Sequence, residues 1–92
     1  MNSPKNWGLQ IDPGVLKTTR KLPREEAGKL LKVINNLRLN PYYGDIEKMK
    51  DEENSWRRRV GSYRIFYKIF INEKIILVFG LERRASKTYK RK

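Results

Sequence analysis

Four arginines surround a predicted tight turn in the second half of the chain. Arg57, Arg58 and Arg59 precede a Gly-Ser pair, and Arg64 follows it after one tyrosine. Guanidinium groups bind phosphate oxygens in a bidentate geometry and stay charged at any physiological pH. These residues at this spacing therefore favour a phosphate-binding site.

The overall charge indicates what such a site could bind. The 92 residues have a formal net charge of +12 and include no histidine and no cysteine. Disulfides, thiolate metal sites and a histidine general base are therefore excluded. Residues 1–55 contain 10 basic and 8 acidic residues (net +2), whereas residues 56–92 contain 12 and 2 (net +10). This concentration predicts a polyanionic partner, nucleic acid or an acidic protein; the alternative is a basic surface kept for solubility.

The C-terminal residues extend the basic half. Residues 82–92 contain six basic residues and Tyr89. An aromatic side chain among cations can stack on a nucleotide base, and its phenol can exchange a proton. The alternative is a disordered basic end, which is common at chain termini.

The length predicts one domain over residues 1–92. No apolar run approaches the roughly 20 residues that span a bilayer, and no signal-peptide pattern is found at the N-terminus. We therefore expect a soluble cytoplasmic protein that has no membrane partner.

Helical patterns dominate the first half. Residues 5–11 form a candidate strand, and Asp12-Pro13 is typical of a helix start, with a helix to about Leu22. Apolar residues recur at helical spacing over residues 24–39, and Asn40-Pro41 ends that pattern. The predicted core stripe of this second helix is Ala27, Leu30, Leu31, Ile34 and Leu37.

Strand patterns dominate the second half. Aromatic and branched residues fill residues 56–60, 63–71 and 74–81, and residues 46–50 alternate as a further strand candidate. The predicted class is α+β, in which a helical hairpin is followed by strands.

A two-residue loop at 61–62 fixes the register of the first hairpin. Arg59 then opposes Arg64, and Arg57 shares their face because side chains alternate between faces. Opposed like charges destabilise a sheet, so a function is indicated. The same face carries Phe66 and Lys68, whereas the opposite face is apolar except for Arg58, which we expect to reach water at its edge.

A second two-residue loop, at 72–73, would bring Arg83 to the arginine face and turn Glu82 away. A loop one residue longer would reverse this. The alternative to a phosphate site is a set of surface arginines whose positive charges are balanced by acidic side chains. The candidate acids are Glu47, Glu52, Glu53 and Glu82.

At this point the ordered segments resemble a known family. The run NPYYGDIEKMKDEENSWRRRVGSYRIFYKI, followed by IILVFGLERRASKTYKR, is similar to the RelE/ParE toxins of toxin–antitoxin systems. The WRRRVGSYRIFY hairpin carries most of the similarity, which covers about residues 8–91. The resemblance depends on the order of these segments along the chain, since no single motif is diagnostic.

The resemblance implies a RelE-like fold, in which an N-terminal strand and a helical hairpin pack on a curved antiparallel sheet. It also implies the activity of a RelE-like mRNA interferase. Such an endoribonuclease cuts messenger RNA in the ribosomal A site and needs no metal or cofactor, because the 2′-hydroxyl attacks the adjacent phosphate. The implied catalytic residues are Arg57, Arg59, Arg64, Arg83 and Tyr89. The implied RNA-binding residues are Phe66, Lys68, Arg84, Lys87 and Lys90.

The sequence departs from the family pattern at two positions. The best-known RelE nucleases have lysines where Arg57 and Arg59 stand, and arginine cannot act as a general base. Tyr89 is therefore the expected base, since nearby guanidinium groups would lower its pKa. Arg59 and Arg64 are assigned to phosphate stabilisation, Arg57 to positioning, and Arg83 to the leaving oxygen.

The resemblance also implies partners. These are an acidic, partly disordered antitoxin encoded next to the toxin, and the ribosome with its mRNA. Two alternatives stay open: a ParE-like toxin that poisons DNA gyrase, and a non-catalytic basic RNA-binding module. The latter predicts RNA binding with steep salt dependence and no cleavage.

Overall fold

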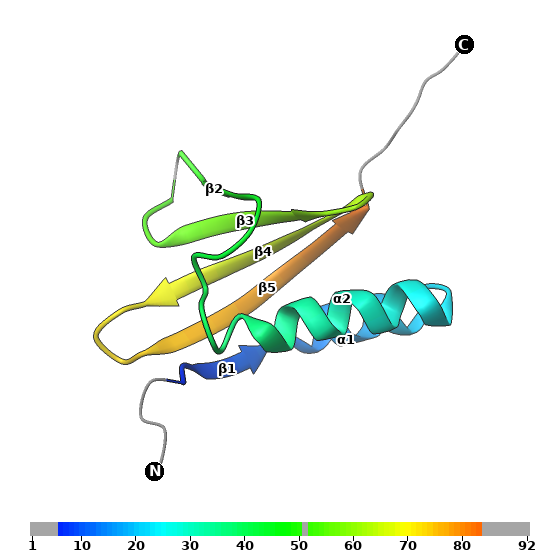
Figure 1. The fold of residues 1–92 in the computed structure, drawn as a ribbon, viewed down its shortest axis with the longest axis horizontal. Helices are drawn as coiled ribbons and strands as arrows, with labels where there is room; N and C mark the ends of the chain where they lie inside the picture. Colours follow the sequence, from blue (N-terminus) through cyan, green and yellow to red (C-terminus); the bar gives the residue numbers. More distant parts are fainter. Residues whose placement is uncertain (1–5, 51, 84–92) are drawn as a thin grey trace.

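The computed structural model describes residues 6–50 and 52–83. Two helices lie beside one five-stranded sheet (Figure 1), as the α+β class predicts. The strand order is β1-β5-β4-β3-β2. In chain order the elements are β1 (Gly8–Ile11), α1 (Pro13–Arg20), α2 (Arg24–Asn36), β2 (Ile46–Lys48), β3 (Ser55–Val60), β4 (Tyr63–Phe70) and β5 (Ile75–Arg83).

The sheet is mixed, which corrects the prediction of a purely antiparallel sheet. Strands β2 to β5 pair antiparallel with their neighbours, but β1 pairs in parallel with β5, with Gly8 opposite Ile75. Tight turns dictate antiparallel neighbours only where they join the two strands. Strand β1 leads into the helices instead, so no turn constrains its direction.

Local sequence sets the start of both helices. The Asp12 carboxylate accepts a hydrogen bond from the Gly14 amide at 2.9 Å, and Pro13 occupies the first turn of α1. Helix α2 has Glu25 and Glu26 in its first turn, where the positive end of the helix dipole stabilises negative charge. Both helices begin where predicted and end two to three residues earlier.

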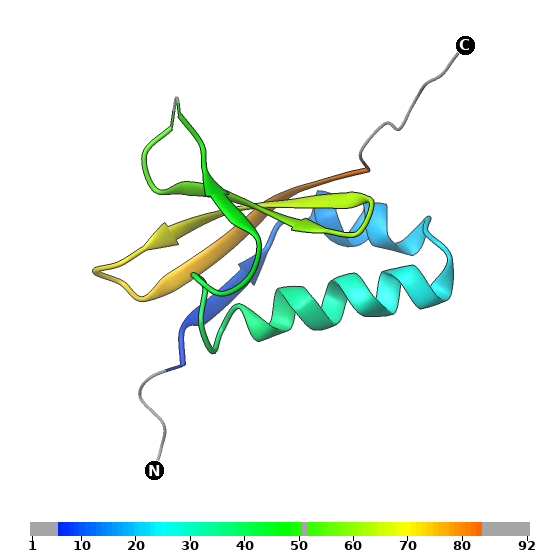
Figure 2. The same ribbon diagram turned by 45° about the horizontal axis from the view of Figure 1, so that its top comes forward.

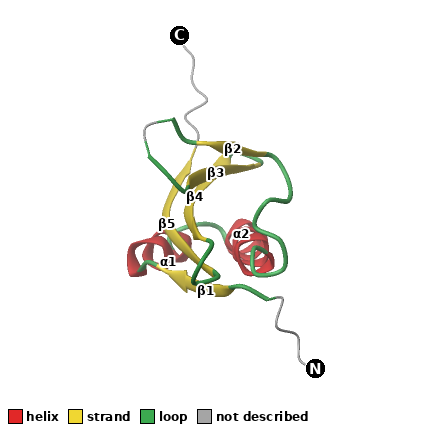
Figure 3. Cartoon of the chain, turned by 90° about the vertical axis from the view of Figure 1, so that its left-hand side faces the viewer, coloured by secondary structure: helices red, strands yellow, loops and turns green. Residues whose placement is uncertain are grey.

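The core lies between α2 and the inner face of the sheet, which curves strongly when it is seen end-on (Figure 3). The helices run side by side and are joined by a short turn (Figure 2). Tyr67 is fully buried, and its hydroxyl donates to the Pro41 carbonyl at 2.7 Å, so it fixes the loop after α2. The buried apolar residues are Val15, Leu30, Ile34, Leu37, Tyr63, Ile65, Tyr67, Ile69, Ile76 and Val78.

Candidate nucleic-acid interface

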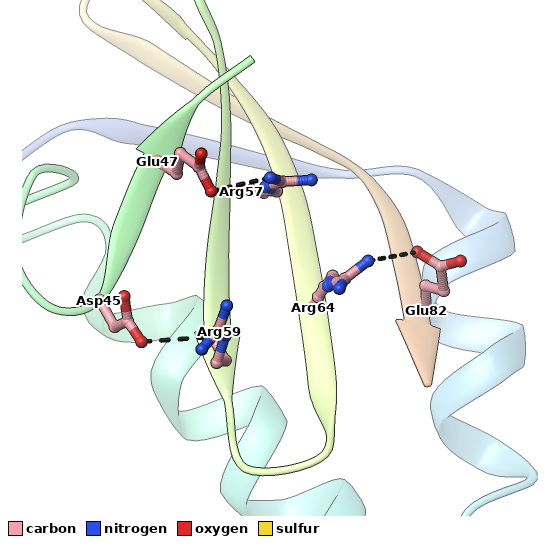
Figure 4. A network of polar contacts seen from close by, with 6 residues as sticks. All are labelled: Asp45, Glu47, Arg57, Arg59, Arg64 and Glu82. Carbon is pink, nitrogen blue, oxygen red and sulfur yellow. Dashed lines mark hydrogen bonds and ion pairs between the residues drawn. The ribbon is translucent and has the colours of Figure 1, made fainter. Parts of the chain in front are cut away.

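The register of the β3–β4 hairpin is confirmed. Arg59 is opposite Arg64 and Arg57 is opposite Phe66, across a turn in which Gly61 has φ +57°. That backbone conformation favours glycine, which suits a two-residue hairpin loop. Arg57, Arg59 and Arg64 therefore share the outer face of the sheet (Figure 4), and we call these three residues the arginine cluster.

The prediction for the end of β5 was wrong. Arg64 is opposite Glu82, whereas Arg83 is opposite Tyr63 on the inner side. The Arg83 guanidinium lies 5.9 Å from the centre of the Tyr63 ring, an ordinary cation–π distance. Glu82 therefore joins the arginine face and Arg83 leaves it, the reverse of the expectation.

A β-bulge causes this reversal. Tyr67 is opposite Val78 but Phe66 is opposite Gly80, so Phe79 is an extra residue in β5. A Cβ at Gly80 would lie 3.1 Å from the Phe66 ring, which explains the glycine at this close approach. Beyond the bulge, each side chain of β5 points to the face opposite to that expected from unbroken alternation.

Aromatic and basic side chains extend the outer face beyond the arginine cluster. Phe66 and Lys68 lie there as predicted, and Phe79, which the sequence did not single out, lies between them. The Phe66 and Phe79 rings are 6.2 Å apart, and the Lys68 ammonium is 5.7 Å from the Phe79 ring centre. Such a surface can stack nucleotide bases beside a phosphate-binding cluster.

Each arginine of the cluster faces one carboxylate (Figure 4). Arg57 is hydrogen-bonded to Glu47 at 2.8 Å, and this contact lowers the pKa of the Glu47 carboxyl. The other two pairs are wider: Arg59 to Asp45 is 4.0 Å and Arg64 to Glu82 is 3.9 Å. Of the four balancing acids expected as an alternative to a phosphate site, Glu47 and Glu82 pair with the cluster, whereas Glu52 and Glu53 form no ion pair with it. Asp45 was missed.

The three pairs leave the cluster accessible. All six side chains are between 34% and 70% exposed, and ion pairs of this kind contribute about 0–1 kcal/mol. Two of the pairs are too long for hydrogen bonds, so their guanidinium donors stay available. The cluster can therefore bind a polyanion, although Arg57 must first release Glu47.

The middle arginine of β3 has a different environment. Arg58 lies on the inner side and is partly exposed at its edge, as predicted, although its Nε atom is buried. The guanidinium donates to the Tyr43 carbonyl at 2.7 Å and packs against Gly44, where a Cβ would lie 2.5 Å from the guanidinium carbon. Gly44 also has φ +98°, so this loop and Arg58 fit each other.

Two inner-face tyrosines stay protonated. Burial raises the pKa of Tyr67 to about 12, and a hydrogen bond donated to Glu26 raises the pKa of Tyr63. Neither is a general base for the outer face. The predicted base Tyr89 lies outside the described residues, as do Arg84, Lys87 and Lys90.

Within residues 6–50 and 52–83, no group of three or more acidic side chains gathers in a metal-binding arrangement. Neither α1 nor α2 is long and apolar enough to cross a membrane.

Comparison with known proteins identifies the family. Residues 11–87 match the family described as the ParE toxin of the type II toxin–antitoxin system parDE. The chain belongs to the ParE toxin family. This confirms the resemblance to RelE/ParE toxins and the assignment of the chain as the toxin of such a system.

Relatives of this ParE-family toxin include proteins named RelE. A protein of Methanocaldococcus jannaschii named "Putative toxin RelE1" is 28% identical over 81 residues, which are 85% of this chain and 90% of that protein. The RelE–RelB complex of Pyrococcus horikoshii matches with a TM-score of 0.77 at 23% identity, over 89% of this chain and 99% of that one. The isolated E. coli RelE toxin matches with a TM-score of 0.73 at 18% identity, over 88% and 87%. At these identities the solved structures show a shared fold.

Proposed function

We propose that this ParE-family toxin is a ribosome-dependent endoribonuclease that cleaves mRNA in the A site without a metal ion. The observation that carries the proposal is the placement of Arg57, Arg59 and Arg64 around one cleft on the outer face of the sheet. The proposal follows the RelE toxins, whose fold the chain shares. Phe66 and Phe79 beside the cluster would hold bases of the bound message.

The reaction is a transfer within the RNA. The 2′-hydroxyl oxygen forms a bond to the adjacent phosphorus, and the bond from phosphorus to the 5′-oxygen breaks. The 2′-hydroxyl loses its proton to the general base, and the leaving 5′-oxygen takes up a proton from water. The products are a 2′,3′-cyclic phosphate and a free 5′-hydroxyl. Arg59 and Arg64 would stabilise the added negative charge on the five-coordinate phosphorus, while Arg57 would position the backbone. Arg83 is not assigned to the leaving oxygen, since it lies on the inner side.

Proton removal from the 2′-hydroxyl needs a base, and arginine cannot supply one. We assign this role to Tyr89, the tyrosine that the sequence analysis singled out. A neighbouring guanidinium would lower the pKa of its phenol.

The partner assignment follows from the relatives. The Pyrococcus horikoshii toxin forms a complex with RelB, and this chain would bind an antitoxin of its own. The negative charge of an acidic antitoxin would complement the net charge of +12, and such an antitoxin could cover the arginine cluster. The ribosome and its mRNA would be the target.

A translation extract programmed with a defined message tests the function. Wild-type protein should cut the ribosome-bound message and leave cyclic phosphate ends. Tyr89→Phe should lower the cleavage rate by about 10²-fold or more, which is typical of a lost general base. An unchanged rate for Tyr89→Phe would exclude it as the base, and an intact message with wild-type protein would exclude the nuclease.

Inhibition of DNA gyrase is the second candidate. The position of Arg83 on the inner side favours gyrase inhibition, because the outer face then lacks one arginine of the expected nuclease set. A supercoiling assay with purified gyrase separates the two. Blocked supercoiling with an intact message supports gyrase inhibition, whereas an intact message with RNA binding alone supports a non-catalytic module.

A further inference from the structure

Two carboxylates share the cleft of the arginine cluster. Asp45 and Glu47 line it together with Arg57, Arg59 and Arg64, and its volume is about 20 Å³. A space of this size holds about one water molecule. A phosphate that binds the guanidinium groups at this cleft would therefore meet the two carboxylates.

Glu47 already occupies the place that a phosphate oxygen would take on Arg57. Its Oε1 atom accepts hydrogen bonds from Nε at 3.2 Å and from Nη2 at 2.8 Å. These two nitrogens form one edge of the guanidinium, and that edge can bind an oxyanion side-on. The register of β2 on β3 places Glu47 directly opposite Arg57, so the contact is built into the sheet.

Asp45 holds the neighbouring arginine more loosely. A hydrogen bond from the Arg59 amide to the Asp45 carbonyl, at 2.9 Å, fixes the loop before β2 beside β3. The Asp45 carboxylate is 4.0 Å from the Arg59 guanidinium, beyond hydrogen-bond distance. The Glu47 carboxylate therefore binds its arginine closely, whereas the Asp45 carboxylate does not, so Glu47 is the side chain that a phosphate must displace from Arg57.

We propose that Glu47 competes with the phosphate groups of the RNA for Arg57 and so sets the affinity of the arginine cluster. The inference rests on the proposed function, since it takes RNA as the ligand. The side chain of Glu47 is 61% exposed, so it can turn into water when a phosphate enters. Polyanion binding then exchanges one anionic partner of Arg57 for another.

Direct binding measurements test this inference. We would compare wild-type protein, Glu47→Gln and Glu73→Gln, using a short single-stranded RNA and an inorganic polyphosphate as probes at low salt. Glu73→Gln has the same net charge as Glu47→Gln, because each variant replaces one glutamate by glutamine. Glu73 is exposed in the turn between β4 and β5. We expect Glu47→Gln to bind both probes about threefold to fivefold more tightly than Glu73→Gln, the range for an exposed ion pair.

The outcomes are distinct from those of the cleavage assay. Equal affinities for the two variants, or weaker binding by Glu47→Gln, would overturn the competition. So would the absence of any binding at low salt, because the cluster would then not be a phosphate site. Tighter binding by Glu47→Gln would support the inference even if the wild-type protein cleaves no message, which would refute only the ribonuclease.

Discussion

Consecutive arginines of β3 lie in two different environments. Arg57 and Arg59 point to the outer face, where exposed carboxylates are their partners. Arg58 points inward, where its guanidinium binds the Tyr43 carbonyl and packs on Gly44. The same residue type therefore supports the loop on one side of the strand and is free to bind a ligand on the other. Strand alternation, rather than residue type, decides between the two roles.

The two environments also differ in what a substitution would change. Under the proposed function, an outer-face guanidinium would exchange one exposed partner for another, so we expect its loss to affect RNA binding and cleavage. The Arg58 guanidinium belongs to the packed structure, and its Nε atom is buried without a hydrogen-bond partner among the described residues. Its loss affects the free energy of unfolding.

The largest expected effect is on cleavage. Arg64→Ala removes a donor that would stabilise the charge developing on phosphorus, so we expect cleavage to fall by about 10²–10³-fold. The measurement is the rate at which cyclic phosphate ends form in the translation extract. The matched control is Arg24→Ala, which removes an exposed arginine at the start of α2. A similar loss in both variants would mean that overall charge, rather than the cluster, matters.

The next effect is on stability and concerns the inner face. Arg58→Met keeps the apolar stem but removes the hydrogen bond to the Tyr43 carbonyl. We expect the free energy of unfolding in urea to fall by about 1–3 kcal/mol. Arg57→Met, on the outer face, should change it by less than about 1 kcal/mol. Equal changes would contradict the contrast between the two faces.

The smallest effect is a pH dependence on the outer face. The Arg57 contact lowers the pKa of Glu47 in the folded state, so its stabilisation is present above the unfolded pKa of about 4.3. It is lost as the pH falls through the lowered folded pKa. Urea unfolding should show wild-type protein slightly more stable than Glu47→Gln at pH 7, with the difference vanishing in acid. A difference that does not change with pH would contradict this.

The sequence predicted the first hairpin because its geometry is local. A two-residue loop and strict alternation fix every pair between β3 and β4, including Arg59 opposite Arg64. The stripe of α2 is local in the same sense, because helical periodicity places Leu30, Ile34 and Leu37 on one side. The hairpin prediction was confirmed and positioned three of the five expected catalytic residues. The stripe was confirmed at Leu30, Ile34 and Leu37 but was wrong at Leu31, which is 37% exposed.

The other parts of the site depend on contacts that no local rule supplies. The bulge at Phe79 lies inside a strand, where its one local signal is Gly80, because an isolated glycine in a strand pattern can mark a bulge. The prediction did not use that signal, so the faces of Glu82 and Arg83 were reversed. Strand β2 is joined to β3 by the longer segment 49–54, which does not fix a register. The contact between Glu47 and Arg57 therefore could not be derived from spacing.

The bulge shows how strongly the outer face depends on the length of β5, because one extra residue reverses the faces of the residues that follow it. If Leu81 were deleted and the pairing on either side kept, Arg83 would take the outward place opposite Arg64 and Glu82 would face inward. A carboxylate beside Arg64 would then become a guanidinium, a change of two charge units without any substitution. A one-residue insertion or deletion beyond the bulge can thus change the charge of this surface as much as a charge-reversing point mutation.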